Sequence, residues 1–217
     1  LYSERQFAHS GFRAIGRWAA ERWQKAELAE LLAEDMRQLL HDGHLGALFR
    51  IALDKHAPHH TPDDLIVLQK IYRTHIPEIS LYDDARWAIE YFANHAPMGL
   101  ITDGSTDMQA TKIRALGVAD HFKEVIFTHD GGGREFHKPH PWSYEKMETA
   151  MGGPSDRFVY VGDNASKDFV TPNARGWKSV QVHRPGAIHD QSKVASGGTP
   201  RHTICSLYEL PALIDEP

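Results

Sequence analysis

The sequence predicts an α/β fold in two parts, a group of helices followed by a parallel sheet that helices cover. Three observations lead to this prediction. Apolar residues recur at helical spacing through residues 4–95, and after Pro97 short apolar runs alternate with helical segments that end in glycine. In addition, polar residues follow directly after several apolar runs, at the strand ends where parallel sheets bind ligands.

The first part is typical of a small helical bundle. One helix is predicted from six apolar residues at i, i+3 and i+4 spacing, namely Leu28, Leu31, Leu32, Met36, Leu39 and Leu40. A second is predicted to begin at Thr61-Pro62-Asp63-Asp64, which offers a capping hydroxyl, a proline for the first helical position and acids for the first turn. Another helix is expected after Asp83.

The second part is predicted to contain four strands and a weaker fifth, at residues 98–102, 125–128, 158–162, 178–182 and 203–205. Gly117 and Gly152 lie where a left-handed cap would end the intervening helices. Residues 185–202 are polar and predict a long surface loop, and residues 206–214 predict a closing helix. Alternating strands and helices imply a parallel sheet.

Composition limits the possible partners. The 217 residues are 41% hydrophobic and 24% charged with a formal net charge of -5, so we expect a globular protein that does not bind nucleic acid. No run approaches the roughly 20 apolar residues of a membrane-spanning helix, and no signal peptide is evident, so no membrane association is expected. The single cysteine, Cys205, cannot form an intramolecular disulfide, which favours a reducing compartment such as the cytoplasm. Because Cys205 lies in an apolar run, we expect its side chain to be buried in the core. The sequence does not indicate an oligomeric state.

A phosphate site is suggested by Thr102-Asp103-Gly104-Ser105, which follows the first apolar run and precedes a helix expected to begin near Thr106. A hydroxyl and free backbone N–H groups at a helix N-terminus can bind phosphate. Taken alone, a threonine after a strand is more often a cap or turn residue.

A metal site is suggested by Gly162-Asp163-Asn164 at the end of the third run, with Asp168 five residues later. Two carboxylates that converge at the end of a strand suit Mg²⁺, which prefers oxygen ligands. A turn aspartate and a solvated helix acid are the alternative.

Two loop sequences could bind anions. Lys138 lies between the prolines of His137-Lys138-Pro139-His140-Pro141, which restrict the backbone, so the lysine could neutralise phosphate or orient a carboxylate. Residues 130–134 read Asp-Gly-Gly-Gly-Arg and could wrap an anion with Arg134 as donor, although glycine runs are more often flexible connectors.

The order of these fragments resembles the second, third and fourth motifs of the haloacid dehalogenase superfamily. The resemblance covers nearly the whole chain and implies a Rossmann-like parallel sheet core with an inserted α-helical cap domain of type 1. Residues 4–80 would be the cap. Residues 81–217, with an upstream strand that is not in the sequence shown, would be the core.

The resemblance also implies a role for each residue. Thr102 would bind the transferred phosphoryl group with help from the backbone around Asp103 and Gly104, and Lys138 would stabilise negative charge. Asp163 would hold Mg²⁺, with Asp168 as a ligand or support. The implied reaction is Mg²⁺-dependent hydrolysis of a small phosphorylated metabolite through an aspartyl-phosphate, and the subgroup resemblance suggests a sugar or nucleotide phosphate as the substrate.

The family's first motif, Asp-x-Asp-x-Thr, does not occur in residues 1–217. In this subgroup the motif commonly runs into Leu-Tyr, and the sequence starts at Leu1-Tyr2, so we expect the motif upstream. Its strand lies in the middle of such sheets, and leaving it out would leave two facing strands with unpaired backbone groups, each costing about 1–3 kcal/mol. The alternatives are a noncatalytic regulatory or interaction module and a metal-independent dehalogenase, against which the pair Asp163 and Asp168 argues.

Overall fold

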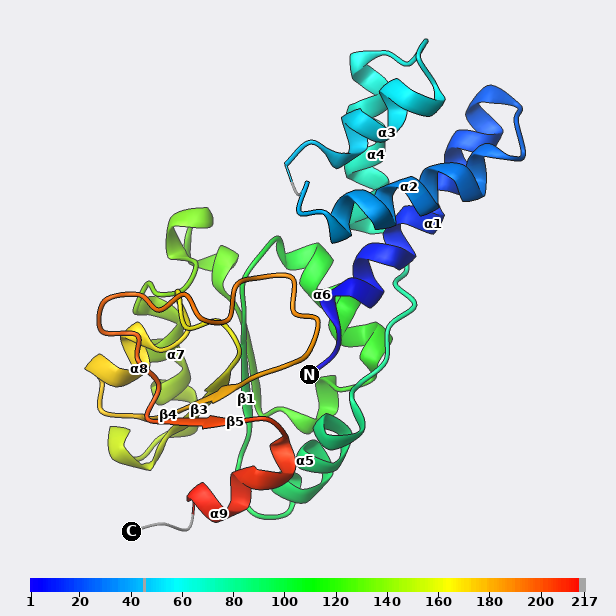
Figure 1. Ribbon diagram of the computed structural model, residues 1–217. Coiled ribbons are helices and arrows are strands. Elements are labelled where there is room, and N and C mark those ends of the chain that lie inside the picture. The colour runs from blue at the N-terminus through cyan, green and yellow to red at the C-terminus, as the bar shows by residue number, and fades with distance from the viewer. Residues whose placement is uncertain (45, 215–217) are drawn as a thin grey trace. The chain divides into compact units, whose positions relative to one another are not determined.

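The computed structural model describes residues 1–44 and 46–214, which form two compact units. The helical unit is Glu4–Ser80, and the α/β unit combines Leu1–Ser3 with Leu81–Pro217. Figure 1 shows the helical unit in blue to cyan and the α/β unit mainly in green to red. The expected α/β fold is confirmed.

The helical unit contains α1 (Glu4–Trp23), α2 (Leu28–His41), α3 (Leu48–His56) and α4 (Pro62–Thr74). Helices α1 and α2 approach closely at Gly16, where an added Cβ would lie 2.1 Å from the carbonyl oxygen of Ala29. The predicted apolar face of α2 is mostly confirmed, because Leu28, Leu32, Met36 and Leu40 are buried. Leu31 was assigned to that face wrongly and is 49% exposed.

The start of α4 is as predicted. The Thr61 hydroxyl accepts the backbone N–H of Asp64 at 3.4 Å, and the Asp64 carboxylate accepts the backbone N–H of Thr61 at 2.8 Å. Pro62 occupies the first helical position. Buried Asp64 also accepts a hydrogen bond from Arg22 of α1 at 3.2 Å, so the cap of one helix is bound to another.

The α/β unit alternates strands and helices in the predicted order. Its strands are β1 (Gly99–Thr102), β2 (Glu124–Phe127), β3 (Val159–Gly162), β4 (Lys178–Val182) and β5 (His202–Ile204). Its helices are α5 (Asp83–Ala93), α6 (Thr106–Leu116), α7 (Trp142–Met151), α8 (Val170–Ala174) and α9 (Leu210–Ile214). Gly117 ends α6 with φ of 66°, the left-handed cap expected there. Residues 185–201 contain no helix or strand.

The strands of the α/β unit form two parallel sheets, one of two strands and one of three. Strand β1 pairs with β2, and β3 pairs with β4, which pairs with β5. Within the described residues no ladder joins β1 to β3, so each has one unpaired edge.

Three apolar clusters stabilise this unit. The first joins α5 to β4, β5 and the C-terminal turn, the second packs α7 against β2, β3 and Trp177, and the third lies between α5, α6 and the first two strands. At the start of the chain, Tyr2 and Leu81 form an antiparallel bridge, and the N–H of Tyr82 donates to the carbonyl of Leu1 at 3.0 Å.

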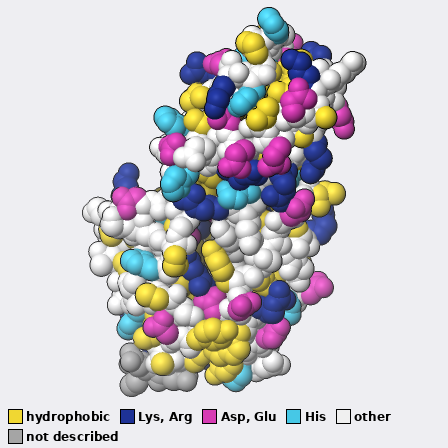
Figure 2. All heavy atoms as spheres, turned by 45° about the vertical axis from the view of Figure 1, so that its right-hand side comes forward, with side chains coloured by type: hydrophobic (Ala, Val, Ile, Leu, Met, Phe, Trp, Pro, Cys, Tyr) yellow, Lys and Arg dark blue, Asp and Glu magenta, His cyan; other side chains and the backbone are white. Residues whose placement is uncertain are grey.

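The surface agrees with the modest net charge. On the face shown in Figure 2, acidic, basic and histidine side chains are interspersed. None of the helices within residues 1–44 and 46–214 combines the length and apolarity needed to span a membrane.

Candidate functional site

Thr102 is the last residue of β1, and its side chain faces the first turns of α6. Its hydroxyl donates to Oε1 of Gln109 at 2.9 Å. Helix α6 begins at Thr106 after Ser105, whose side chain makes no capping hydrogen bond. Gly104 has φ of 117°, and an added Cβ would lie 2.9 Å from the Gln109 amide nitrogen. The glycine therefore lets the chain turn closely from the strand into an uncapped helix N-terminus.

Asp103 takes part through its side chain, which was not predicted. Its Oδ1 accepts the Thr128 hydroxyl and the Lys138 backbone N–H, both at 3.0 Å, and its Oδ2 pairs with the Lys167 ammonium at 2.6 Å. Burial raises the pKa of the Asp103 carboxyl, but Lys138 and Lys167 outweigh that effect and lower it. Asp103 is therefore an ionised centre that connects three loops.

Lys138 is the buried cation of the site. Its ammonium lies 2.8 Å from Oδ1 of Asp168 and donates to the Tyr160 hydroxyl at 3.1 Å. The side chains of Lys138 and Asp168 are 10% and 3% exposed. Burial lowers the pKa of Lys138, but Asp168 and Asp103 raise it above its ordinary value. The lysine is thus a fixed positive charge at neutral pH.

Asp163 and Asp168 have different environments. Oδ2 of Asp168 accepts the backbone N–H groups of Asp163 at 3.3 Å and Asn164 at 2.9 Å. Gly162 permits this, since an added Cβ would lie 2.7 Å from that oxygen. The Asp163 carboxylate is 52% exposed and lies 3.8 Å from Nε2 of His189. Asp168 is therefore held by the protein, whereas Asp163 faces solvent.

The structure brings five predicted site residues into one network. Contacts connect Asp103 to Lys138, Lys138 to Asp168 and Asp168 to the backbone of Asp163, and Thr102 precedes Asp103 in the chain. The sequence reasoning missed three participants, Thr128, Tyr160 and Lys167. A signal existed for Thr128, which ends its apolar run as Thr102 ends the preceding one.

The network lies where β1, β2 and β3 end. Three carboxylates, two lysines, two threonine hydroxyls and a helix N-terminus meet there, a combination that can bind a phosphate group and an oxygen-seeking cation. Within the described ranges, no group of three or more His, Cys, Asp or Glu side chains is arranged to hold a metal by itself.

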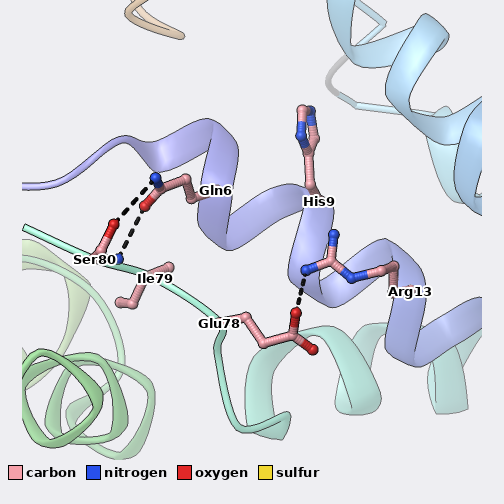
Figure 3. Close-up of a pocket in the computed structure, with 6 residues that line it drawn as sticks. All are labelled: Gln6, His9, Arg13, Glu78, Ile79 and Ser80. Atoms are coloured by element: carbon pink, nitrogen blue, oxygen red, sulfur yellow. Dashed lines mark hydrogen bonds and ion pairs between the residues drawn. The ribbon is translucent and has the colours of Figure 1, made fainter.

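A separate pocket lies within the helical unit (Figure 3). It is a cavity of about 410 Å³ lined by Gln6, His9, Arg13, Glu78, Ile79 and Ser80. The Ser80 N–H donates to the Gln6 amide oxygen at 3.0 Å, and Arg13 pairs with Glu78 at 2.6 Å. These polar groups bond to one another, and no predicted site residue lines the pocket.

Two family comparisons cover most of the chain. The family described as haloacid dehalogenase-like hydrolase matches residues 3–169, and one described as HAD-hydrolase-like matches residues 135–210.

Similar sequences include phosphatases. A glyceraldehyde 3-phosphate phosphatase of Methanopyrus kandleri is 30% identical over 119 residues, which are 55% of this chain and 49% of that protein. A phosphoserine phosphatase of Thermus thermophilus is 31% identical over 87 residues, 40% of this chain and 34% of that protein. The chain thus matches about half or less of the length of these relatives.

Similar structures share the fold. A HAD family hydrolase of Deinococcus radiodurans, solved with bound phosphate and sodium, has a TM-score of 0.63 at 20% identity and covers 99% of this chain and 90% of its own. The HAD-hydrolase YfnB of Bacillus subtilis, bound to magnesium, has a TM-score of 0.60 at 17% identity, and the match covers 94% of this chain and 81% of the YfnB chain.

Proposed function

The chain belongs to the haloacid dehalogenase-like hydrolases, and on that premise we propose that it is the greater part of a Mg²⁺-dependent phosphomonoester hydrolase. The observation that carries the proposal is the convergence of Asp103, Lys138 and Asp168, which are far apart in the sequence, on one network beside Thr102. Its phosphatase relatives support this reaction, and we propose a small phosphorylated metabolite as the substrate.

The residues present fit a magnesium ion. Mg²⁺ commonly takes one or two protein carboxylates and fills its other positions with water and substrate phosphate. The half-exposed Asp163 carboxylate fits a direct ligand, while both Asp168 oxygens already contact Lys138 or backbone N–H groups. We therefore assign metal binding to Asp163 and support to Asp168. Bound there, the ion would neutralise charge on the phosphoryl oxygens.

The chain's own groups bind and position the phosphoryl group. The Thr102 hydroxyl and the N–H groups at the start of α6 donate hydrogen bonds to its oxygens. To do so, the Thr102 hydroxyl exchanges its hydrogen bond to Gln109 for one to the phosphoryl group. The Lys138 ammonium, held by Asp168 and Tyr160, stabilises the negative charge of the transferred group. The Asp103 carboxylate follows Thr102 in the chain and, through its hydrogen bonds to Thr128 and Lys138, holds the loops that carry Thr102 and Lys138 together.

The nucleophile is not assigned to a residue of this chain. In the family the phosphoryl group passes to an aspartate of an Asp-x-Asp motif, and residues 1–217 contain no such sequence. The proposal therefore gives this chain the binding and charge-stabilising part of an aspartyl-phosphate reaction. The helical unit occupies the sequence position of the family's cap, and we propose that role for it.

The test is phosphate release by the full-length protein from a panel of small phosphomonoesters, with Mg²⁺ and with a chelator. We expect turnover to need Mg²⁺ and Asp163→Asn to lower kcat/KM by about 100-fold or more, since a metal ligand contributes several kcal/mol. The control is Asp156→Asn, which removes the charge of an exposed aspartate elsewhere in the same unit and should retain full activity.

Three outcomes oppose the proposal. Parental activity in D163N would refute the metal assignment. A folded, full-length protein that hydrolyses none of the phosphomonoesters would favour the noncatalytic interaction module. Chelator-resistant release of halide from 2-chloropropionate, without phosphate release, would favour the dehalogenase.

A further inference from the structure

The glycine run after β2 is a folded turn rather than a flexible connector. Two short 3-10 turns, Thr128–Gly131 and Arg134–Phe136, flank it. Added Cβ atoms at Gly131 and Gly132 would each lie 2.6 Å from the Phe136 ring, and Gly132 has φ of 147°. The backbone therefore wraps directly over an aromatic ring, which only glycine permits at this distance.

Hydrogen bonds at both ends attach this loop to the phosphoryl-binding network. At its start, Thr106, the first residue of α6, donates through its hydroxyl to Asp130 at 2.5 Å. At its end, the backbone N–H of Lys138 donates to Asp103 at 3.0 Å. The side chains between these points are therefore presented beside Thr102 and Lys138 by a defined scaffold.

Three donor side chains gather on this loop. Nδ1 of His129 lies 3.4 Å from Nε2 of His137, and the two rings are 5.6 Å apart between centroids. Burial lowers the pKa of His137, Asp103 opposes this, and the positive charges of His129, Lys167 and Arg134 lower it further.

The positive charge of Arg134 is available to a ligand. Arg134 is exposed, and across residues 1–44 and 46–214 it forms no ion pair. Within the described residues, neither of the loop's two acids forms an ion pair with Arg134. Asp130 is bonded to Thr106, and the Glu135 carboxylate lies against Gly133, with Oε2 3.0 Å from the position of an added Cβ.

We propose that His129, Arg134 and His137 form a second anion subsite beside the phosphoryl group, which selects phosphomonoesters whose leaving group carries a further acidic group such as a carboxylate. The guanidinium would pair with that acid, and the imidazole N–H groups would donate to it. This inference rests on the proposed function and adds to it a class of substrate.

The test compares two substrates with one skeleton, 3-phosphoglycerate and glycerol 3-phosphate, which differ in a carboxylate and a neutral hydroxymethyl group. For the full-length protein we expect a higher kcat/KM with 3-phosphoglycerate. Arg134→Gln should lower that value about tenfold while changing glycerol 3-phosphate turnover less than twofold. Arg134→Lys should recover part of the loss. Arg114→Gln, at an exposed arginine of α6, is the matched control and should leave both substrates unchanged.

The outcomes separate the subsite from the overall reaction. Equal losses on both substrates in R134Q, or no loss on either, overturn the subsite. If the parent hydrolyses neither compound, the proposed function fails for this substrate class, and calorimetric binding of the same pair then decides the subsite. Weaker binding of 3-phosphoglycerate alone in R134Q supports it, and equal parental affinity for both compounds overturns it.

Discussion

Lys138→Met would remove the cation from the most buried ion pair of the site. The side chains of Lys138 and Asp168 are 10% and 3% exposed, and the ammonium lies 2.8 Å from the carboxylate. Removing one partner of a buried pair costs on the order of 3–5 kcal/mol, because the other charge stays buried without compensation. Asp168 keeps two backbone N–H donors, so we expect the free energy of unfolding to fall by about 3 kcal/mol, near the lower end of that range.

A double-mutant cycle separates this pair from its surroundings. Lys138→Met and Asp168→Asn should each lower the free energy of unfolding. The double variant should be destabilised by at least about 1.5 kcal/mol less than the sum of the two single effects. The measurement is urea unfolding followed by tryptophan fluorescence at pH 7. Because the pKa of Lys138 is raised above its ordinary 10.5, its contribution is complete below that value and is lost only as the pH rises through the higher folded pKa.

Lys146→Met supplies the matched control. It makes the same substitution in α7, where the lysine is 50% exposed and lies 3.8 Å from Glu124, and it should cost less than about 1 kcal/mol. The reasoning is refuted if K138M costs no more than K146M, or if the two mutations of the cycle are additive within about 0.5 kcal/mol.

Two further predictions concern stability outside the site. Burial raises the pKa of Asp84, but hydrogen bonds from Arg184, the Leu207 N–H and Ser206 lower it to about 2. The ionised Asp84 therefore contributes roughly 2 kcal/mol to the free energy of unfolding at neutral pH. This contribution is present above the ordinary pKa of the group and is lost as the pH falls toward 2. The destabilisation by Asp84→Asn, measured by urea unfolding, should therefore be smaller in acid than at neutral pH. Gly16→Ala should destabilise the helical unit by about 1–3 kcal/mol in thermal unfolding, since its Cβ would lie 2.1 Å from a backbone oxygen. A stabilised variant, as helix propensity alone predicts, would contradict that packing.

Local sequence patterns predicted most of the fold and the positions of the candidate site. The four stronger apolar runs correspond to β1 to β4, and the weaker fifth overlaps β5. Period and turn residues are local properties, so neighbouring residues suffice to read them. The polar residues after β1 and β3 could be assigned to one edge because the carboxyl ends of parallel strands share an edge.

Contacts between distant residues could not be predicted in this way. The Lys167–Asp103 ion pair spans 64 positions, and nothing in either segment specifies which cation would reach Asp103. Two burial predictions were wrong for a related reason. Cys205 is exposed because β5 ends at Ile204, and Leu31 lies at the margin of the apolar face of α2. Periodicity gives the direction of a side chain but not what the rest of the chain places there.

The bridge between Tyr2 and Leu81 brings together the two points where the chain leaves the α/β unit and returns to it. Because the chain leaves the α/β unit after Ser3 and returns at Leu81 through two paired segments, the ends of the inserted unit meet. An insertion whose ends meet can be exchanged, lengthened or excised with little change to its host. Evolution or protein engineering could therefore graft a different set of helices between these residues while the sheet and its network of charges are kept.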